Sequence, residues 1–262
     1  MIPRLTATQF SFFMSSGRTA PALCACIDEV ERPEGDYVVK LCGALDARQA
    51  GLVNELLASQ LAAHFGLSCP EPAVIRLEGA LVNLIAAAYP ERSNALSGSA
   101  GLNFGTKHLI GVSTWPVDKA IPEERFVSAT EIFAFDALIQ NPDRCFDNPN
   151  LFTRSDGLFV YDHEAAFSFL LDVLPTGSPW QADQQRYMER HVFFRRLKSK
   201  PIDLGGFCAD LARLSDEVLG RMVTEVPPEW DNEESIARIV RHLSEVRDHA
   251  DDFAESIRRF LR

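Results

Sequence analysis

The spacing of apolar residues changes along this chain, and that change limits the possible folds more than any other feature of the sequence. Short apolar runs typical of strands occupy residues 20–30, 36–43 and 70–78, while leucines at helical spacing fill residues 47–67. From residue 128 onward the chain is mainly helical in pattern. The sequence therefore predicts an α+β protein whose first part is rich in strands and whose second part is helical.

The expected organisation is a β-rich lobe with one helix over residues 1–90, a connecting stretch over 91–127 and a helical lobe over 128–262. The connecting stretch is rich in Ser, Gly, Asn and Pro, which predicts a linker or a working loop. Ser128 and Glu131 have the spacing of a capping box, so a helix is expected to begin there. Residues 233–261 are expected to form a long amphipathic helical segment.

Charge and cysteine usage limit the partners and the compartment. With 26 Lys and Arg against 37 Asp and Glu, the net charge of −11 argues against a general nucleic-acid binder. The chain has no run of apolar residues long enough to cross a membrane and no recognisable signal peptide, so we expect a cytoplasmic protein that binds no membrane. The six cysteines lack metal-site spacing and are expected to be reduced thiols, most of them buried.

Two polar stretches in the second part predict chemistry. The sequence NPDRCFDNPNLF, residues 141–152, follows a predicted helix and carries Asp143 and Asn148, and Asp162 ends a short strand-like run further on. An ordinary turn would explain the first stretch alone, since turns favour Asn, Asp and Pro. Together, however, two carboxylates and an amide oxygen are the groups that magnesium-assisted phosphoryl transfer requires.

The first part supplies a cation with a matching acid. Lys40 ends a predicted strand, and Glu55 lies in the middle of the following helix. A buried lysine needs a charge partner to stay ionised, and a helix packed beside the strand could provide it. Taken singly, Lys40 could be a solvated strand end and Glu55 an exposed helical charge.

In their order along the chain, the motifs SSGR, YVVK, NELL, NPDRCFDN and VYDHEAAF resemble the HipA-like kinase family, within the protein-kinase-like and phosphatidylinositol-kinase-like superfamily. The resemblance implies a two-lobed protein-kinase-like fold that uses ATP and Mg²⁺. It implies Asp143 as catalytic base, Asn148 and Asp162 as magnesium ligands, Lys40 on the nucleotide phosphates with Glu55 as its partner, and Ser15, Ser16, Gly17, Arg18 and Thr19 as a loop that covers the phosphates. The sequence departs from the family at Cys145, where relatives often carry His, and its phosphate loop has one glycine only.

The resemblance implies transfer of the ATP γ-phosphoryl group to a Ser or Thr hydroxyl of a protein, with a toxin or regulatory role and an antitoxin-like or regulatory partner. A small-molecule or lipid kinase and a nucleotide-binding pseudokinase module are the alternatives. Retention of Lys40, Asp143, Asn148 and Asp162 argues against the pseudokinase. The basic cluster in residues 191–200 is expected to be a solvated helix face or to meet an acidic partner. Asp136 is assigned no role of its own; it could support the polar loop, as we call residues 141–152.

Overall fold

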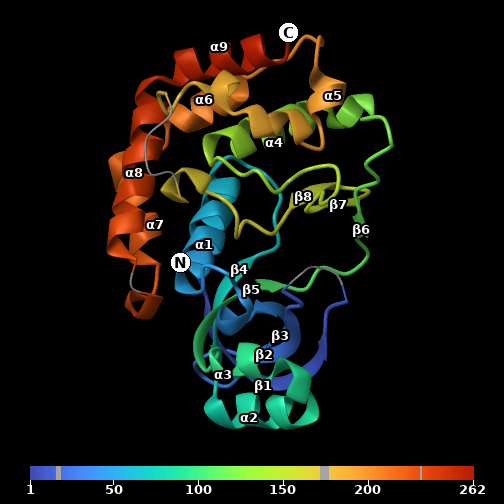
Figure 1. The fold of residues 1–262 in the computed structure, drawn as a ribbon, viewed down its shortest axis with the longest axis vertical. Helices are drawn as coiled ribbons and strands as arrows, with labels where there is room; N and C mark the ends of the chain where they lie inside the picture. The colour runs from blue at the N-terminus through green and yellow to red at the C-terminus, as the bar shows by residue number, and fades with distance from the viewer. Residues whose placement is uncertain (16–18, 172–176, 231) are drawn as a thin grey trace. The chain divides into compact units, whose positions relative to one another are not determined.

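The protein is described by a computed structural model that covers residues 1–15, 19–171, 177–230 and 232–262. Strands dominate the N-terminal region and helices the C-terminal region, as the sequence predicts (Figure 1). The chain divides into two compact units. Unit 1 comprises residues 1–57, 70–110 and 224–232, and unit 2 comprises residues 58–69, 111–223 and 233–262. The lobe boundaries expected near residues 90 and 127 stay a prediction.

Unit 1 is built around a closed barrel of five strands in the order β1-β2-β3-β5-β4. The strands are β1 (Arg4–Phe13), β2 (Ala22–Ile27), β3 (Pro33–Lys40), β4 (Pro72–Leu77) and β5 (Gly101–Lys107). All neighbouring strands pair antiparallel except β1 and β4, which are parallel. Closure pairs every strand on both sides, so the barrel leaves no free edge.

Two of these strands were not expected from the sequence. β1 has polar residues at many positions and an irregular burial pattern, with register shifts against β2. β5 lies in the stretch predicted to be a linker or loop, and it contains Gly101 and Gly105. That prediction was wrong for residues 101–107. Gly105 is required there because a Cβ atom would come within 2.6 Å of Ile75 on the neighbouring strand.

The helices near the barrel are α1 (Gln49–His64), α2 (Gly79–Ala88) and α3 (Ser93–Ser97). The first half of α1 belongs to unit 1, and it presents the side chain of Glu55 to the end of β3. The interior of the barrel is lined by small and branched apolar side chains, including Ala7, Cys24, Val39 and Ile75. These contacts fix the position of Lys40 at the end of β3.

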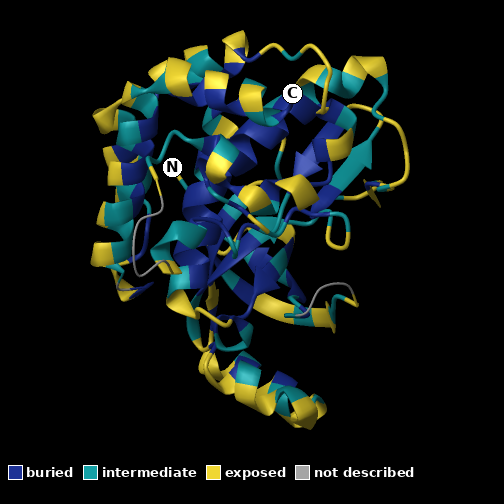
Figure 2. Ribbon diagram, turned by 45° about the horizontal axis from the view of Figure 1, so that its top comes forward, coloured by how far each residue is buried: buried dark blue, intermediate teal, exposed yellow. Residues whose placement is uncertain are grey.

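Unit 2 contains a three-stranded sheet in the order β6-β7-β8 and most of the helices. Its strands are β6 (Ser113–Thr114), β7 (Leu151–Arg154) and β8 (Gly157–Val160), and its helices are α4 (Phe126–Leu138), α5 (Phe194–Leu197), α6 (Gly205–Ala212), α7 (Asp216–Thr224, whose last residue falls in unit 1), α8 (Glu233–Asp248) and α9 (Ala250–Phe260). Buried and exposed residues alternate along α8 and α9, so each buries one face (Figure 2).

Two helix ends differ from the sequence prediction. α4 begins at Phe126 rather than Ser128, because a 3₁₀ turn over Glu123–Arg125 leads directly into it, and no side chain caps its first turn. The segment expected over 233–261 is two helices, since His249 leaves the helical conformation at φ −121° and ψ 36°. No helix in the described ranges is both long and apolar enough to span a bilayer.

Candidate active site

Asp136, near the C-terminal end of α4, is a fully buried carboxylate and the centre of a polar network in unit 2. Its Oδ1 accepts a hydrogen bond from Asn141 Nδ2 at 3.1 Å, and its Oδ2 accepts one from Arg144 Nε at 2.6 Å. Burial alone would raise the pKa of Asp136, but the charge of Arg144 and the hydrogen bond from His191 outweigh it and lower the pKa to about 2. Asp136 is therefore ionised at neutral pH.

His191 completes the shell around this carboxylate. Its Nε2 lies 3.0 Å from Asp136 Oδ2, and its Nδ1 accepts the backbone N–H of Phe193 at 3.1 Å. Since Nδ1 accepts, Nε2 must carry the proton and donate it to Asp136. Burial is the main reason that the pKa of His191 is lowered, so the ring is neutral near pH 7 and the network carries one buried negative and one buried positive charge.

Arg144 connects Asp136 to the two chain segments that carry the predicted metal ligands. Its guanidinium is buried, and Nη1 donates to the carbonyl oxygens of Asn150 and Tyr161, the latter at 3.2 Å. The backbone N–H of Tyr161 also donates to the Asn150 carbonyl at 3.2 Å. Arg144 thus fixes the polar loop to the segment immediately before Asp162.

Asp143 is held by three asparagines. Its backbone N–H donates to Asn141 Oδ1 at 3.1 Å, and its Oδ2 accepts hydrogen bonds from Asn148 Nδ2 at 2.8 Å and Asn150 Nδ2 at 3.0 Å. Asn141 also bonds Asp136, so the backbone of Asp143 is fixed through the buried network. Within the described residues, Oδ1 of Asp143 accepts no hydrogen bond, and it is the oxygen left to accept a proton from an acceptor group.

Asn148 and Asp162 supply hard oxygen donors. The amide nitrogen of Asn148 is committed to Asp143, so its Oδ1 is left for another partner. Asp162 follows β8 and has a left-handed backbone with φ 58°, a conformation that aspartate tolerates better than most residues. Both side chains are accessible to solvent, Asn148 more than Asp162.

This donor set suits Mg²⁺. No group of three or more His, Cys, Asp or Glu side chains able to hold a metal occurs among the described residues. Mg²⁺ needs no such cage, because it usually takes one or two protein oxygens and completes its octahedral shell with phosphate oxygens and water. One amide oxygen and one carboxylate therefore fit a magnesium ion bound together with a nucleotide.

In unit 1, the structure brings Lys40 and Glu55 together as the sequence predicts. Lys40 Nζ and Glu55 Oε1 form a hydrogen-bonded ion pair in which the side chains are 11% and 1% exposed. Because each charge is taken out of water, the ion pair favours the ionised form of both side chains. Burial of this pair distinguishes Lys40 from an ordinary solvated lysine at the end of a strand.

The predicted phosphate loop is only partly described. Ser15 is exposed just after β1, and Thr19 is half-buried before β2, while Ser16, Gly17 and Arg18 lie outside the described residues. The loop closes with a backbone hydrogen bond from Met14 to Pro21 of 2.8 Å. The role of the loop stays a prediction.

Sequence reasoning missed four residues that position the site, namely Asn141, Arg144, Asn150 and His191. Asn141 and Asn150 lie inside the quoted polar stretch and could have been noticed as further amides. His191 lies far from that stretch in the sequence, and no spacing rule connects it to Asp136.

Comparisons with known proteins identify the family and the fold. A sequence model described as HipA-like kinase matches residues 10–256. No curated protein sequence is similar enough to be identified as a relative. Among solved structures, the chain is similar to the crystal structure of CtkA, a proinflammatory kinase from Helicobacter pylori, with 10% sequence identity, a TM-score of 0.51 and complete coverage of both chains. At this identity, the likeness shows a shared fold.

Proposed function

The chain belongs to the HipA-like kinase family, and from this premise we propose that it is an ATP- and Mg²⁺-dependent kinase whose acceptor is a serine or threonine hydroxyl of a protein. In this reaction the acceptor oxygen forms a bond to the γ-phosphorus of ATP, and the bond from that phosphorus to the bridging oxygen of the β-phosphate breaks. ADP leaves with the bridging oxygen, and the proton of the hydroxyl passes to Asp143. Atoms and charge are then conserved without any further reactant.

Asp143 is assigned as the group that orients the acceptor and takes its proton. One carboxylate oxygen is already occupied by the amides of Asn148 and Asn150, at 2.8 and 3.0 Å, which fixes the plane of the carboxylate. The other oxygen then has a fixed direction toward the acceptor hydroxyl, so the carboxylate need not reorient during the reaction. This orientation is the observation that supports the proposal most strongly.

Asn148 and Asp162 are assigned as the residues that hold Mg²⁺. When bound, the ion neutralises charge on the phosphate oxygens of ATP. Arg144 keeps Tyr161, and with it Asp162, in register with the polar loop through its hydrogen bonds to Asn150 and Tyr161.

Lys40 is assigned to the phosphates of ATP. A lysine for this task must be charged and must have few alternative conformations, and the ion pair with Glu55 meets both needs. Glu55 is a positioning residue, since it acts through Lys40.

The proposal is tested by thermal-shift titration with ATP, with and without Mg²⁺, alongside a phosphoryl-transfer assay with labelled ATP and a mixture of proteins as acceptors. We expect Mg·ATP to raise the melting temperature of the wild type, because a ligand at about a hundredfold excess over its Kd stabilises the folded state by about 2.7 kcal/mol. Asp162→Asn should lose the magnesium-dependent part of the shift. Asp143→Asn should keep the shift and lose transfer.

The matched control is Asp156→Asn, which removes an exposed aspartate from the turn between β7 and β8, near Asp162 in sequence but paired with Arg154. It should behave as the wild type in both assays. If no nucleotide changes the melting temperature at millimolar concentration, the kinase mechanism is refuted. A shift without transfer to any acceptor would instead identify a regulatory nucleotide-binding module.

A further inference from the structure

An open groove with a volume of about 1480 Å³ lies beside the polar loop, entirely within unit 2. Phe146 and Asp147, which line it, are part of the same loop as Asp143 and Asn148. Half-buried apolar side chains contribute to its lining, among them Val117, Ile121 and Phe126. A groove with an apolar lining next to the proposed catalytic base is placed where a kinase would receive its acceptor.

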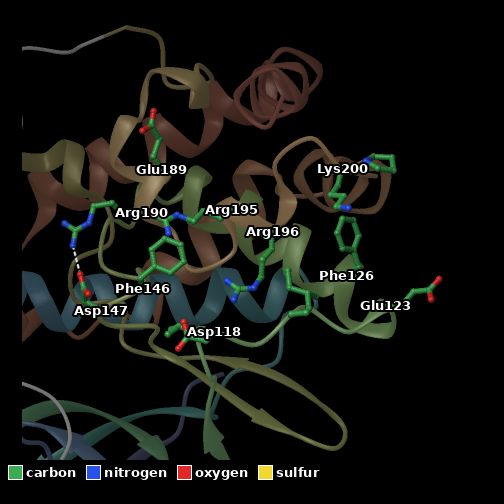
Figure 3. A pocket seen from close by; sticks show the side chains of 14 residues that line it. Asp118, Glu123, Phe126, Phe146, Asp147, Glu189, Arg190, Arg195, Arg196 and Lys200 are labelled. Atoms are coloured by element: carbon green, nitrogen blue, oxygen red, sulfur yellow. Dashed lines mark hydrogen bonds and ion pairs between the residues drawn. The ribbon is translucent and has the colours of Figure 1, made fainter.

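One wall of the groove is positively charged. Arg190, Arg195, Arg196 and Lys200 line it, and Figure 3 shows Arg190, Arg195 and Arg196 gathered beside Phe146. Arg190 is paired with Asp147 at 2.9 Å. In the part of the chain that the structure describes, the other three cations form no ion pair with a carboxylate. Three unpaired cations on one wall stand out in a chain of net charge −11.

The positive wall is joined to the polar loop that carries Asp143. The guanidinium of Arg195 lies 4.8 Å from the ring centroid of Phe146. Backbone hydrogen bonds run from Phe146 to the Arg190 carbonyl at 3.3 Å and from Val192 to the Arg144 carbonyl at 3.1 Å. Movement of this wall relative to Asp143 is therefore restricted by direct hydrogen bonds.

The groove also has acidic lining residues, Asp118, Glu123 and Glu189. Figure 3 shows Glu123 at the right of the view and Glu189 above Arg190, both away from Phe146, while Asp118 lies below Phe146. The charge next to the loop itself is thus mainly positive. An acceptor segment lying against Phe146 would meet Arg195 and Arg196 first.

We propose that this groove binds the acceptor segment of a protein substrate and selects segments that carry acidic side chains close to the serine or threonine. An apolar side chain of the segment packs on the groove lining, and its carboxylates face Arg195, Arg196 and Lys200. Charge complementarity of this kind contributes mainly to specificity and to the rate of association. The inference rests on the proposed kinase function, because it gives the substrate class for that reaction.

The test measures binding of labelled peptides by fluorescence anisotropy. One peptide has a central serine flanked by glutamates and a leucine, and its partner has glutamine in place of every glutamate. The wild type should bind the acidic peptide about tenfold more tightly, and raising NaCl from about 0.05 to about 0.5 M should weaken that binding, because salt screens charges at an exposed site. In a transfer assay, the same preference should appear as a lower KM for the acidic peptide.

The double variant Arg196→Glu/Lys200→Glu should lose the preference. Lys198→Glu is the control: it makes the same kind of substitution in the same segment, with half of the double variant's total charge change, but Lys198 lies over the ring of Phe194 and does not line the groove. It should keep the wild-type preference. If the double variant does not fold, the wild-type comparison of the two peptides and its salt dependence still decide the question.

Equal binding of the two peptides by the wild type, or a preference that survives in the double variant, would overturn the inference. The Mg·ATP thermal shift of the wild type is measured in the same experiment, so the two proposals can fail separately. A nucleotide response without a peptide preference overturns only the groove. A peptide preference without a nucleotide response supports the groove and overturns the kinase.

Discussion

Replacing Asp136 by asparagine removes the buried negative charge that Arg144 and His191 share, and it preserves the size of the side chain. Asparagine still offers one oxygen to Asn141, but it cannot accept an ionic hydrogen bond from Arg144. The guanidinium of Arg144 would then remain buried without an opposite charge, because the other acceptors of its hydrogen bonds are neutral carbonyl groups. The change tests whether this network stabilises the loop that carries Asp143.

The expected cost follows from the burial of both partners, whose side chains are 0% exposed. Breaking a buried ion pair by removing one partner costs about 3–5 kcal/mol, since the remaining charge cannot be solvated. Proteins are typically stable by only about 5–15 kcal/mol, so Asp136→Asn should lower the melting temperature clearly at neutral pH.

The pH dependence gives an independent measure of the same charge. The folded protein lowers the pKa of Asp136 from 3.8 to about 2, so ionised Asp136 contributes stability above the unfolded pKa. That contribution, about 2 kcal/mol, is lost as the pH falls from 3.8 through about 2. The difference in stability between wild type and variant should therefore be the same at pH 7 and pH 5 and about 1 kcal/mol smaller at pH 3.

Urea unfolding followed by circular dichroism at these three pH values measures the difference directly. Asp156→Asn, on an exposed turn, serves as control and should unfold as the wild type does. A loss of less than about 1 kcal/mol for Asp136→Asn at pH 7 would refute the claim that Asp136 compensates a buried charge. A difference that does not shrink at pH 3 would refute the assignment of the low pKa to Asp136.

Three further predictions concern other parts of the molecule. Lys40→Met and Glu55→Gln should each cost about 3–5 kcal/mol in urea unfolding, whereas the double variant should cost less than their sum, since it removes both charges of the buried pair together. Burial lowers the pKa of His242 from 6.5 to about 4, so protonation favours the unfolded state, and stability should fall by about 3 kcal/mol as the pH is lowered from 6.5 to about 4. His242→Asn should remove that part of the pH dependence in thermal unfolding. Gly43→Ala should destabilise unit 1 by about 1–3 kcal/mol, because a Cβ atom would collide with a backbone carbonyl oxygen of α3, while Gly220→Ala in α7, where a Cβ atom meets nothing, should raise the melting temperature slightly.

A helix or strand could be predicted from the sequence where the spacing of its apolar residues is regular. The helix at 49–64 and the strands at 22–27 and 72–77 have clear apolar spacing and were expected, while the strand expected over 36–43 lies three residues earlier, at 33–40. β1 was not, because its exposed and buried positions follow no simple alternation and the strand pairs with register shifts. β5 was not, because its glycines resemble a loop, although Gly105 is there to let the strand approach Ile75.

The candidate site could be predicted where its residues are close in sequence or joined by one helix and one strand. Asp143 and Asn148 belong to one loop, and Lys40 pairs with Glu55 across β3 and α1. The support of the loop could not be predicted in the same way, since Asp136 and His191 are 55 residues apart in sequence. A buried polar network is recognised by the hydrogen bonds between its members, which only a structure supplies.

The departure from the family pattern at Cys145 does not weaken the proposed role of Asp143. The Cys145 side chain is buried, and its backbone N–H bonds the carbonyls of Asp143 and Asn148 at 2.9 and 3.0 Å. Its backbone also forms an isolated bridge with His191, the imidazole that bonds Asp136. The loop is therefore shaped by main-chain hydrogen bonds that any residue other than proline can make at this position. A cysteine can thus replace histidine there while Asp143 and Asn148 keep the geometry that phosphoryl transfer needs.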